Sequence, residues 1–237
     1  KKIISNQYTC YIHKFYADEE CIIFALAFND LVVKMDHNGN IHYIIEINQR
    51  LEVNEVNESK KYDYRFVTKP WSGATGYYHF NNIQMINGEI WLTSRNTNSF
   101  IVVNNARKKA ELKTLNHYSP AMIHDGDCYK GEFYFTSVDG KIIKAKKASE
   151  YDKDIFNYEL IVTHLHKIDK VENNWCRGIL IRENNMHVTL DGRYGSDLAF
   201  KLATFDLQFE LKSVRRFEWS KVGSENEIKY VTGFDIV

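Results

Sequence analysis

Short apolar runs, in which hydrophobic and polar residues often alternate, are spaced along almost the whole chain. Turn-forming groups separate them, among which are Asn29-Asp30, His37-Asn38-Gly39-Asn40, Asn87-Gly88, Lys130-Gly131 and Asp139-Gly140. A period of two places alternate side chains on opposite faces of a strand, and turns of this composition connect hairpins. The pattern predicts strands over residues 22–28, 31–35, 41–47, 141–146, 158–164, 198–205 and 209–217.

Three segments of the chain repeat one plan. Residues 81–94 match residues 124–137 at a shift of 43, with Gly-Glu and Thr-Ser coinciding. Residues 177–190 follow a further 53 residues along the chain, with Asn184-Asn185 as the predicted turn. Each copy contains a short strand, a tight turn and a second strand, and a further strand pair follows the later copies. Four strands at this spacing have the period of a β-propeller blade.

The repeats predict a single all-β domain over residues 1–237, a five-bladed β-propeller of four-stranded antiparallel blades. An earlier copy, beginning with the strand over 22–28, supplies a fourth blade. The two ends of the chain, residues 3–15 and 227–237, both have strand-like patterns. We expect these N- and C-terminal strands to pair in a fifth blade and to close the ring, because closure hides sheet edges that otherwise invite aggregation.

The composition agrees with a β-rich fold and weighs against partners of high charge. Aromatic residues make up 14% of the chain, with 15 Tyr and 14 Phe, and such side chains fit a pleated, half-buried surface. The 31 Lys and Arg residues balance the 31 Asp and Glu residues. Because binding to phosphates or anionic lipids needs a concentrated basic surface, we expect no nucleic-acid partner and no membrane partner.

The four cysteines, Cys10, Cys21, Cys128 and Cys176, show no CxxC spacing. Neither a zinc knuckle nor a dense disulfide framework is indicated, which favours a reducing compartment such as the cytoplasm. The longest apolar run, residues 21–28, is far shorter than the roughly 20 residues that cross a bilayer. The first residue is Lys1 rather than Met, so the sequence leaves export open, as it does the oligomeric state.

The repeat alignment places Asn81, His124 and Arg177 at one structural position, near the start of the first strand of three blades. First strands line the channel of a propeller, and we predict that these side chains converge at its mouth. The residue type varies there while the scaffold repeats, as expected of positions that serve a ligand. The alternative is structural, because such side chains also cap turns and pair with Asp125 or Asp127.

Neighbouring residues extend the candidate site. A guanidinium can bind a carboxylate or phosphate through two hydrogen bonds, and an indole offers a flat face to a sugar or an aromatic ring. The predicted ligand-binding residues are therefore Asn81, Arg177, Trp175 and His79. A divalent metal is a candidate cofactor, with His79, His124 and Asp125 as its ligands. His124 and Asp125 are also the candidate catalytic acid and base. Packing between blades is the alternative role of Trp175.

Other reactive residues are assigned structural roles. We expect His164 and His166 to be exposed on an outer strand, His187 to be a core histidine and Cys176 to be a buried, unreactive thiol. The chain contains no GxSxG, P-loop, GxGxxG or HExxH motif. The main hydrolase, kinase and dehydrogenase signatures are therefore missing.

Residues 131–142, Gly-Glu-Phe-Tyr-Phe-Thr-Ser-Val-Asp-Gly-Lys-Ile, resemble the blades of gluconolactonase-like and strictosidine-synthase-like propellers. In those blades a strand ends in Thr or Ser before an Asp-Gly turn. The resemblance implies a propeller that binds calcium through Glu, Asn and Asp residues, of which Asn81 and Asp125 are the matching positions here. A second resemblance, to plant-type glutaminyl cyclases, lies in Thr189-Leu-Asp-Gly-Arg-Tyr-Gly-Ser196, with Trp175-Cys-Arg-Gly-Ile in place of that family's Gln-Gly-Leu segment.

The predicted function is the binding of a small polar or anionic molecule, for example a sugar-like one, at the mouth of the channel. One alternative is an enzyme, either a metal-assisted hydrolase or an acyl-transfer or cyclisation enzyme, which uses the same residues. Another is a protein-interaction scaffold, which an apolar patch on the rim would favour.

Overall fold

The computed structural model describes residues 12–27, 30–55, 77–104, 109–113, 115–116, 123–147, 160–168, 175–191 and 199–218. Within these ranges every regular element is a β-strand, which confirms the prediction of an all-β chain. No helix in this part of the chain is long and apolar enough to cross a membrane. The chain divides into two compact units, Lys1–Lys113 and Thr114–Val237, which are described separately as unit 1 and unit 2.

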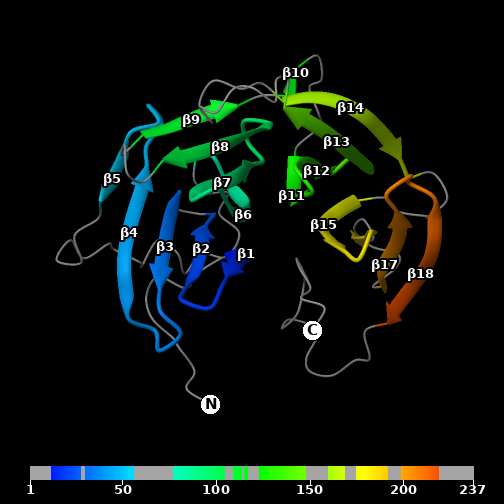
Figure 1. The fold of residues 1–237 in the computed structure, drawn as a ribbon, viewed down its shortest axis with the longest axis horizontal. Helices are drawn as coiled ribbons and strands as arrows, with labels where there is room; N and C mark the ends of the chain where they lie inside the picture. Colours follow the sequence, from blue (N-terminus) through cyan, green and yellow to red (C-terminus); the bar gives the residue numbers. More distant parts are fainter. Residues whose placement is uncertain are drawn as a thin grey trace. The chain divides into compact units, whose positions relative to one another are not determined.

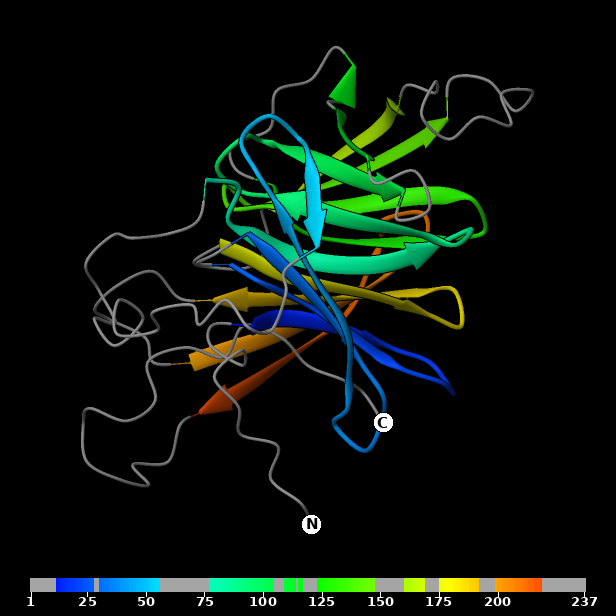
Figure 2. The same ribbon diagram turned by 90° about the vertical axis from the view of Figure 1, so that its left-hand side faces the viewer.

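Unit 1 contains two antiparallel sheets in which each strand pairs with the next along the chain (Figure 1). The strands of sheet A are β1 (Ile12–Ala17), β2 (Ile22–Leu26), β3 (Leu31–Met35), β4 (Ile41–Ile47) and the short β5 (Val53–Glu55). The strands of sheet B are β6 (Phe80–Ile86), β7 (Glu89–Ser94), β8 (Ser99–Asn104) and β9 (Lys109–Lys113), which lie side by side in Figures 1 and 2.

Unit 2 repeats this arrangement. The strands of sheet C are β10 (Leu115–Asn116), β11 (Ile123–Tyr129), β12 (Glu132–Ser137), β13 (Lys141–Lys147) and β14 (Leu160–Lys167). The two-residue β10 joins the outer strand β14 in parallel, and the other pairings are antiparallel. The strands of sheet D are β15 (Trp175–Arg182), β16 (Asn185–Asp191), β17 (Ala199–Asp206) and β18 (Leu211–Glu218).

The described residues form four sheets, two in each unit, so the prediction of five blades is wrong. The N-terminal strand β1 does not belong to a fifth blade, because it pairs with β2 and forms the first strand of sheet A. The strand predicted over 22–28 is thus the second of its sheet. The other proposed member of a fifth blade, residues 227–237, lies outside the described residues.

The hairpin turns follow the repeat. Asn87 and Gly88 both have positive φ, and so do Lys130 and Gly131. Two consecutive left-handed residues are the requirement of the two-residue turn that suits the twist of a hairpin. In sheet D the corresponding pair is Glu183 and Asn184, with φ of 50° and 63°, rather than the predicted Asn184-Asn185. The shift is one residue, and the strands β15 and β16 still occupy the predicted places.

Each unit has its own hydrophobic core between its two sheets. In unit 1, Ile23 and Val32 of sheet A belong to the same buried cluster as Ile83 and Ile101 of sheet B. In unit 2 one cluster joins the two sheets, with Tyr134 and Ile142 from sheet C and Ile179, Val188 and Ala203 from sheet D. Neighbouring blades are therefore held together by apolar packing within each unit.

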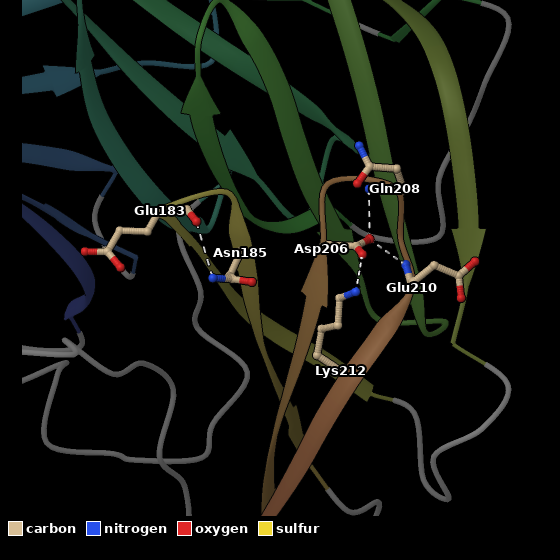
Figure 3. A network of polar contacts seen from close by, with 6 residues as sticks. All are labelled: Glu183, Asn185, Asp206, Gln208, Glu210 and Lys212. Carbon is tan, nitrogen blue, oxygen red and sulfur yellow. Dashed lines mark hydrogen bonds and ion pairs between the residues drawn. The ribbon is translucent and has the colours of Figure 1, made fainter.

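In several hairpins a five-residue polar loop connects the two strands. Between β17 and β18, the carboxylate of Asp206 accepts hydrogen bonds from the backbone N–H groups of Gln208 and Glu210 and from Nζ of Lys212 (Figure 3). In the loops that follow β3 and β4, Oδ1 of Asp36 and Oδ1 of Asn48 likewise accept hydrogen bonds from the backbone N–H groups two and four residues further along. Asp and Asn are suited to this position because their short side chains reach the backbone two residues further along.

Candidate functional site

In every sheet, the first strand that is longer than two residues contains a β-bulge near its start. The register is broken between Ile12 and Phe15 in β1, between Phe80 and Asn82 in β6, between Ile123 and Gly126 in β11 and between Cys176 and Ile179 in β15. In each strand, one polar residue directly follows the last regular pair before the break. These four residues, which we call the bulge residues, are His13, Asn81, His124 and Arg177. Bulges are over-represented beside functional sites because they redirect a side chain.

Three of the bulge residues are the positions that the repeat alignment selected. His13 is the fourth, and the sequence analysis missed it because it began sheet A at β2. The signal was present in the sequence, because a large apolar residue directly precedes His13, Asn81 and His124 alike, namely Ile12, Phe80 and Ile123. Asn81 belongs to unit 1 and both His124 and Arg177 belong to unit 2. The convergence of all three on one point therefore stays a prediction.

In unit 2, the two bulge residues contact each other directly. Nδ1 of His124 donates a hydrogen bond to the backbone oxygen of Arg177 over 2.8 Å, and Nη1 of Arg177 donates to Nε2 of the same imidazole over 3.0 Å. The ring is therefore neutral, with its proton on Nδ1. Both residues are buried, with His124 2% and Arg177 9% exposed. These two candidate site residues are therefore in direct contact.

Asp125 is also tied to the neighbouring sheet. Its Oδ1 accepts a bond from the N–H of Gly126 over 2.7 Å, and its Oδ2 accepts one from the N–H of Ile179 over 2.9 Å. Two residues further along β11, Oδ2 of Asp127 accepts a bond from the N–H of Ile181 over 2.7 Å. Carboxylates of sheet C thus bind alternate backbone groups on the edge strand of sheet D.

Small residues let the two sheets of unit 2 approach closely. A Cβ atom on Gly178 would lie 2.9 Å from Oγ1 of Thr189 and 3.5 Å from Oδ2 of Asp125. The N–H of Gly178 instead donates to that Thr189 hydroxyl over 2.6 Å. The hydroxyl of Thr136 donates to the backbone oxygen of Arg177, which also accepts from His124. Nothing larger than glycine fits at position 178 without a shift of its neighbours.

These bonds give His124 and Asp125 a definite structural role, because they satisfy the edge of β15. A strand edge has unpaired N–H and C=O groups, which proteins must cover or pair. The catalytic role predicted for the two residues stays a prediction. Trp175 is the first residue of β15 and its backbone pairs with Asp191, while its side chain lies outside the description.

In unit 1, His79 lies immediately before β6 and beside the bulge. It is 2% exposed and adopts a φ of 52°. Its backbone N–H and that of Tyr78 donate to the carboxylate of Asp30, which comes from the turn between β2 and β3. The centroid of its ring lies 5.3 Å from that of His13, so residues of both sheets meet here. Burial raises the pKa of Asp30 to about 6.

Asn81 is the bulge residue with the least explained environment. Its side chain is 3% exposed. Among the described residues, neither its Oδ1 nor its Nδ2 has a hydrogen-bond partner. Buried polar groups are nearly always paired with protein, water or a bound molecule, so this amide marks a place where a partner is to be expected.

The structure does not support the predicted metal site. No group of three or more His, Cys, Asp and Glu residues is placed to hold a metal ion in the described part of the chain. His79 belongs to unit 1, whereas His124 and Asp125 belong to unit 2. Both ring nitrogens of His124 and both oxygens of Asp125 are already hydrogen-bonded within unit 2.

The three cysteines within the described residues do not provide a nucleophile at this site. Cys21, Cys128 and Cys176 are free thiols. Burial raises the pKa of Cys176 far above its ordinary value and raises that of Cys128 to about 11. A thiol is a weak nucleophile unless it is ionised, so both are structural residues at neutral pH.

Comparison with known proteins establishes the fold. No protein-family model and no curated protein matches the chain. Among solved structures, hydrazine synthase of Kuenenia stuttgartiensis matches with a TM-score of 0.53 at 8% identity, over 92% of this chain and 53% of that chain. The β-propeller domain of Cps50 (Swd1) from Myceliophteria thermophila matches with a TM-score of 0.51 at 9% identity, over 86% and 73%. The WD40 repeats of RRP9 match with a TM-score of 0.50 at 11% identity, over 89% and 52%.

These likenesses show a β-propeller fold, in agreement with the repeat analysis. The chain spans about half the length of two of these structures. Identities this low carry no information on activity, and the finer resemblances to gluconolactonase-like, strictosidine-synthase-like and glutaminyl-cyclase propellers have no support from a family model.

Proposed function

We propose that this β-propeller is a binding module for a small polar molecule, which contacts the bulge residue Asn81 in unit 1. The observation that carries the proposal is the buried amide of Asn81, whose oxygen and nitrogen both lack a partner among the described residues. Leaving a buried donor or acceptor unsatisfied costs about 1–3 kcal/mol. A bound molecule that pairs with both atoms removes this penalty.

The neighbourhood of Asn81 supports a built site. The amide lies at a bulge in β6, directly after Phe80 and beside the buried His79, whose ring lies near that of His13 from the adjacent sheet. Two strands and one connecting turn thus supply imidazole and amide groups within unit 1. Pockets with a few placed polar groups on rigid elements are the usual form of a small-molecule site.

A second candidate function, the binding of an anionic molecule, rests on Arg177 in unit 2. A guanidinium carries five N–H donors, and carboxylates or phosphates are its preferred partners. The bond from Nη1 to His124 fixes the orientation of this side chain, as expected of a group that recognises a ligand.

Binding is favoured over catalysis because of what His124 and Asp125 do. A general base must be able to take a proton from the substrate. The ring nitrogens of His124 bond to Arg177, and the oxygens of Asp125 bond to backbone N–H groups. The enzyme and the protein-interaction scaffold stay alternative predictions.

A thermal-shift screen tests the proposal. The wild-type chain and its Asn81→Leu variant are heated with sugars, organic acids, amides and nucleosides. We expect at least one compound to raise the melting temperature of the wild type and not that of the variant, because a ligand stabilises only the state that binds it. Gln84→Leu, the same kind of substitution three residues along β6, is the control and should respond as the wild type does. A screen in which every stabilising compound acts equally on Asn81→Leu contradicts the proposal.

A further inference from the structure

The hydrogen-bonding pattern of Asn81 restricts the chemistry of its ligand. A carboxamide has one oxygen, which only accepts, and one NH₂ group, which only donates. In the described structure both groups are buried and neither has a partner. A ligand that satisfies the whole side chain must therefore present a donor and an acceptor next to each other.

Several common ligand groups fail this requirement. A carboxylate or a phosphate only accepts, so it can pair with Nδ2 and leaves Oδ1 unsatisfied. An ammonium or guanidinium only donates and leaves Nδ2 unsatisfied. Two neighbouring hydroxyl groups of a sugar can pair with an amide at both atoms. Planar edges in which N–H and C=O, or N–H and a ring nitrogen, are adjacent can do so too, as in the pairing of Asn with the edge of adenine.

The neighbouring side chains suit a planar ligand. His79 precedes the bulge directly, and its ring lies 5.3 Å from that of His13 at an angle of 56°. Both imidazoles offer aromatic faces, and each neutral ring also has one donor and one acceptor. Asn82, which follows Asn81, is 4% exposed and adds a second buried amide to the same segment.

We infer that unit 1 recognises an amide-type edge, as found in a primary amide, a lactam or a nucleobase, through two parallel hydrogen bonds to Asn81. The inference rests on the proposed function and names the class of ligand for it. Oδ1 of Asn81 accepts from the N–H of the ligand, and Nδ2 donates to the adjacent acceptor. His13 and His79 contribute contacts at the sides of the ligand.

The test uses matched fragments and saturation-transfer NMR on the full chain. The probes are 2-pyrrolidinone, which has N–H beside C=O, N-methyl-2-pyrrolidinone, which has lost the donor, and propionate, which only accepts. We expect 2-pyrrolidinone to bind at least about tenfold more tightly than the other two, because each leaves a buried group of the site unpaired.

Variants at position 81 provide the second arm. Asn81→Leu should abolish binding of the lactam, and Gln84→Leu should leave it unchanged. Asn81→Asp replaces the donor by an acceptor, so we expect it to lose 2-pyrrolidinone and to gain acetamidinium, which only donates. The fold of each variant is checked by its unfolding transition, and the comparison of probes on the wild type stands even where a variant does not fold.

The outcomes separate the inference from the proposed function. Equal binding of all three probes, lost in Asn81→Leu, overturns the amide-edge inference and leaves the proposed function standing. The same holds if the thermal-shift screen finds an Asn81-dependent ligand that has no such edge. If no compound in either experiment depends on Asn81, both are overturned, and an ordered water is then the partner of the amide.

Discussion

The backbone oxygen of Arg177 accepts two hydrogen bonds from side chains of the adjacent sheet, one from His124 and one from Thr136. Two and four residues later, the N–H groups of Ile179 and Ile181 donate to Asp125 and Asp127. Single side chains of sheet C therefore take the place of a further strand along the edge of β15. Polar residues at these positions hold two blades in register.

Asp127→Ala removes one of these acceptors. The N–H of Ile181 then lacks its partner in a partly buried place, and we expect unit 2 to lose about 1–3 kcal/mol of unfolding free energy. The amide of Ile181 should also exchange with deuterium faster than those in the middle of β16. Hydrogen exchange followed by NMR measures both effects. Asp127→Asn keeps an oxygen acceptor and should show a smaller change, and equal exchange in all three chains contradicts the assigned role.

The buried carboxyl of Asp30 makes the stability of unit 1 depend on pH. Its pKa is raised from 3.8 to about 6 by burial, so between these values the folded state binds more protons than the unfolded state. Stability should fall as the pH rises from about 4 to about 6, by about 3 kcal/mol in all, and then level off. Asp18, Asp36 and Asp206 act in the opposite sense and at lower pH, because their pKa values are lowered and their contribution is lost only as the pH falls below 3.8.

Asp30→Asn should remove most of this dependence. The amide oxygen can still accept from the N–H groups of Tyr78 and His79, while the charge is lost. Urea unfolding at pH 4.5 and pH 7 gives the comparison. The variant should be equally stable at both values, and a wild type whose stability is flat across this window disproves the assignment.

For single residues, the sequence predicted which ones lie at the bulges better than it predicted what those residues contact. The repeat register located Asn81, His124 and Arg177, because a bulge keeps its place when the turns around it keep theirs. It did not show that His124 bonds to the backbone of Arg177, since contacts between blades have no local pattern. His13 was missed because no Gly-Glu turn marks its hairpin.

Among the elements, the polar loops of three hairpins share one geometry. The residue that opens each loop also accepts a bond from the backbone N–H three residues further along. That third residue has positive φ, and it is Gly39 after Asp36, Leu51 after Asn48 and Phe209 after Asp206. The left-handed conformation suits glycine, so the loop must hold Leu51 and Phe209 there by its other bonds. Phe209 is buried against His164, with ring centroids 4.2 Å apart.

Asn48→Ala should show how much the opening residue contributes. The substitution removes two bonds to the backbone N–H groups of Arg50 and Glu52 and one to the Glu52 side chain. We expect a loss of about 1–2 kcal/mol in unfolding free energy, because such local bonds fix the turn. Denaturant unfolding of the variant and of Arg50→Ala, an exposed control in the same loop, makes the measurement. A loss of the same size in both variants would assign the effect to the loop in general and not to Asn48.

The elements themselves were largely predictable. The strands over 141–146, 158–164, 198–205 and 209–217 correspond to β13, β14, β17 and β18, because alternation and turn residues are local signals. The number of blades was not predictable from the same signals. The predicted first repeat begins at residue 22, which leaves β1 outside it. Pairing β1 with the C-terminal end gives a fifth blade that the described residues do not contain.

At the scale of the molecule, each unit is built around its own core. The buried cluster that includes Ile83 and Val32 lies in unit 1, and the cluster that includes Val188 lies in unit 2. Regions of a protein that share a core usually open together as one cooperative group. We therefore expect the two units to behave as two groups in hydrogen exchange.

Core substitutions in one unit at a time test this expectation. Val188→Ala in unit 2 and Val103→Ala in unit 1 both truncate fully buried side chains of these clusters, with an expected loss of roughly 2 kcal/mol each. Exchange should accelerate across the unit that carries the substitution and stay unchanged in the other. Acceleration of both units by either substitution would mean that the chain unfolds as one body.

At the bulges, the backbone register is shared by all four sheets, whereas the bulge residue differs. The same break in register recurs in four first strands, although the residue there is His, Asn, His or Arg. In β6 the regular pairs before and after the break, Phe80 with Ser94 and Asn82 with Thr93, leave Asn81 outside the ladder. We therefore expect that randomising position 81 keeps these flanking pairs and varies only the proposed recognition. A library at this one position is then a starting point for the directed evolution of new specificities.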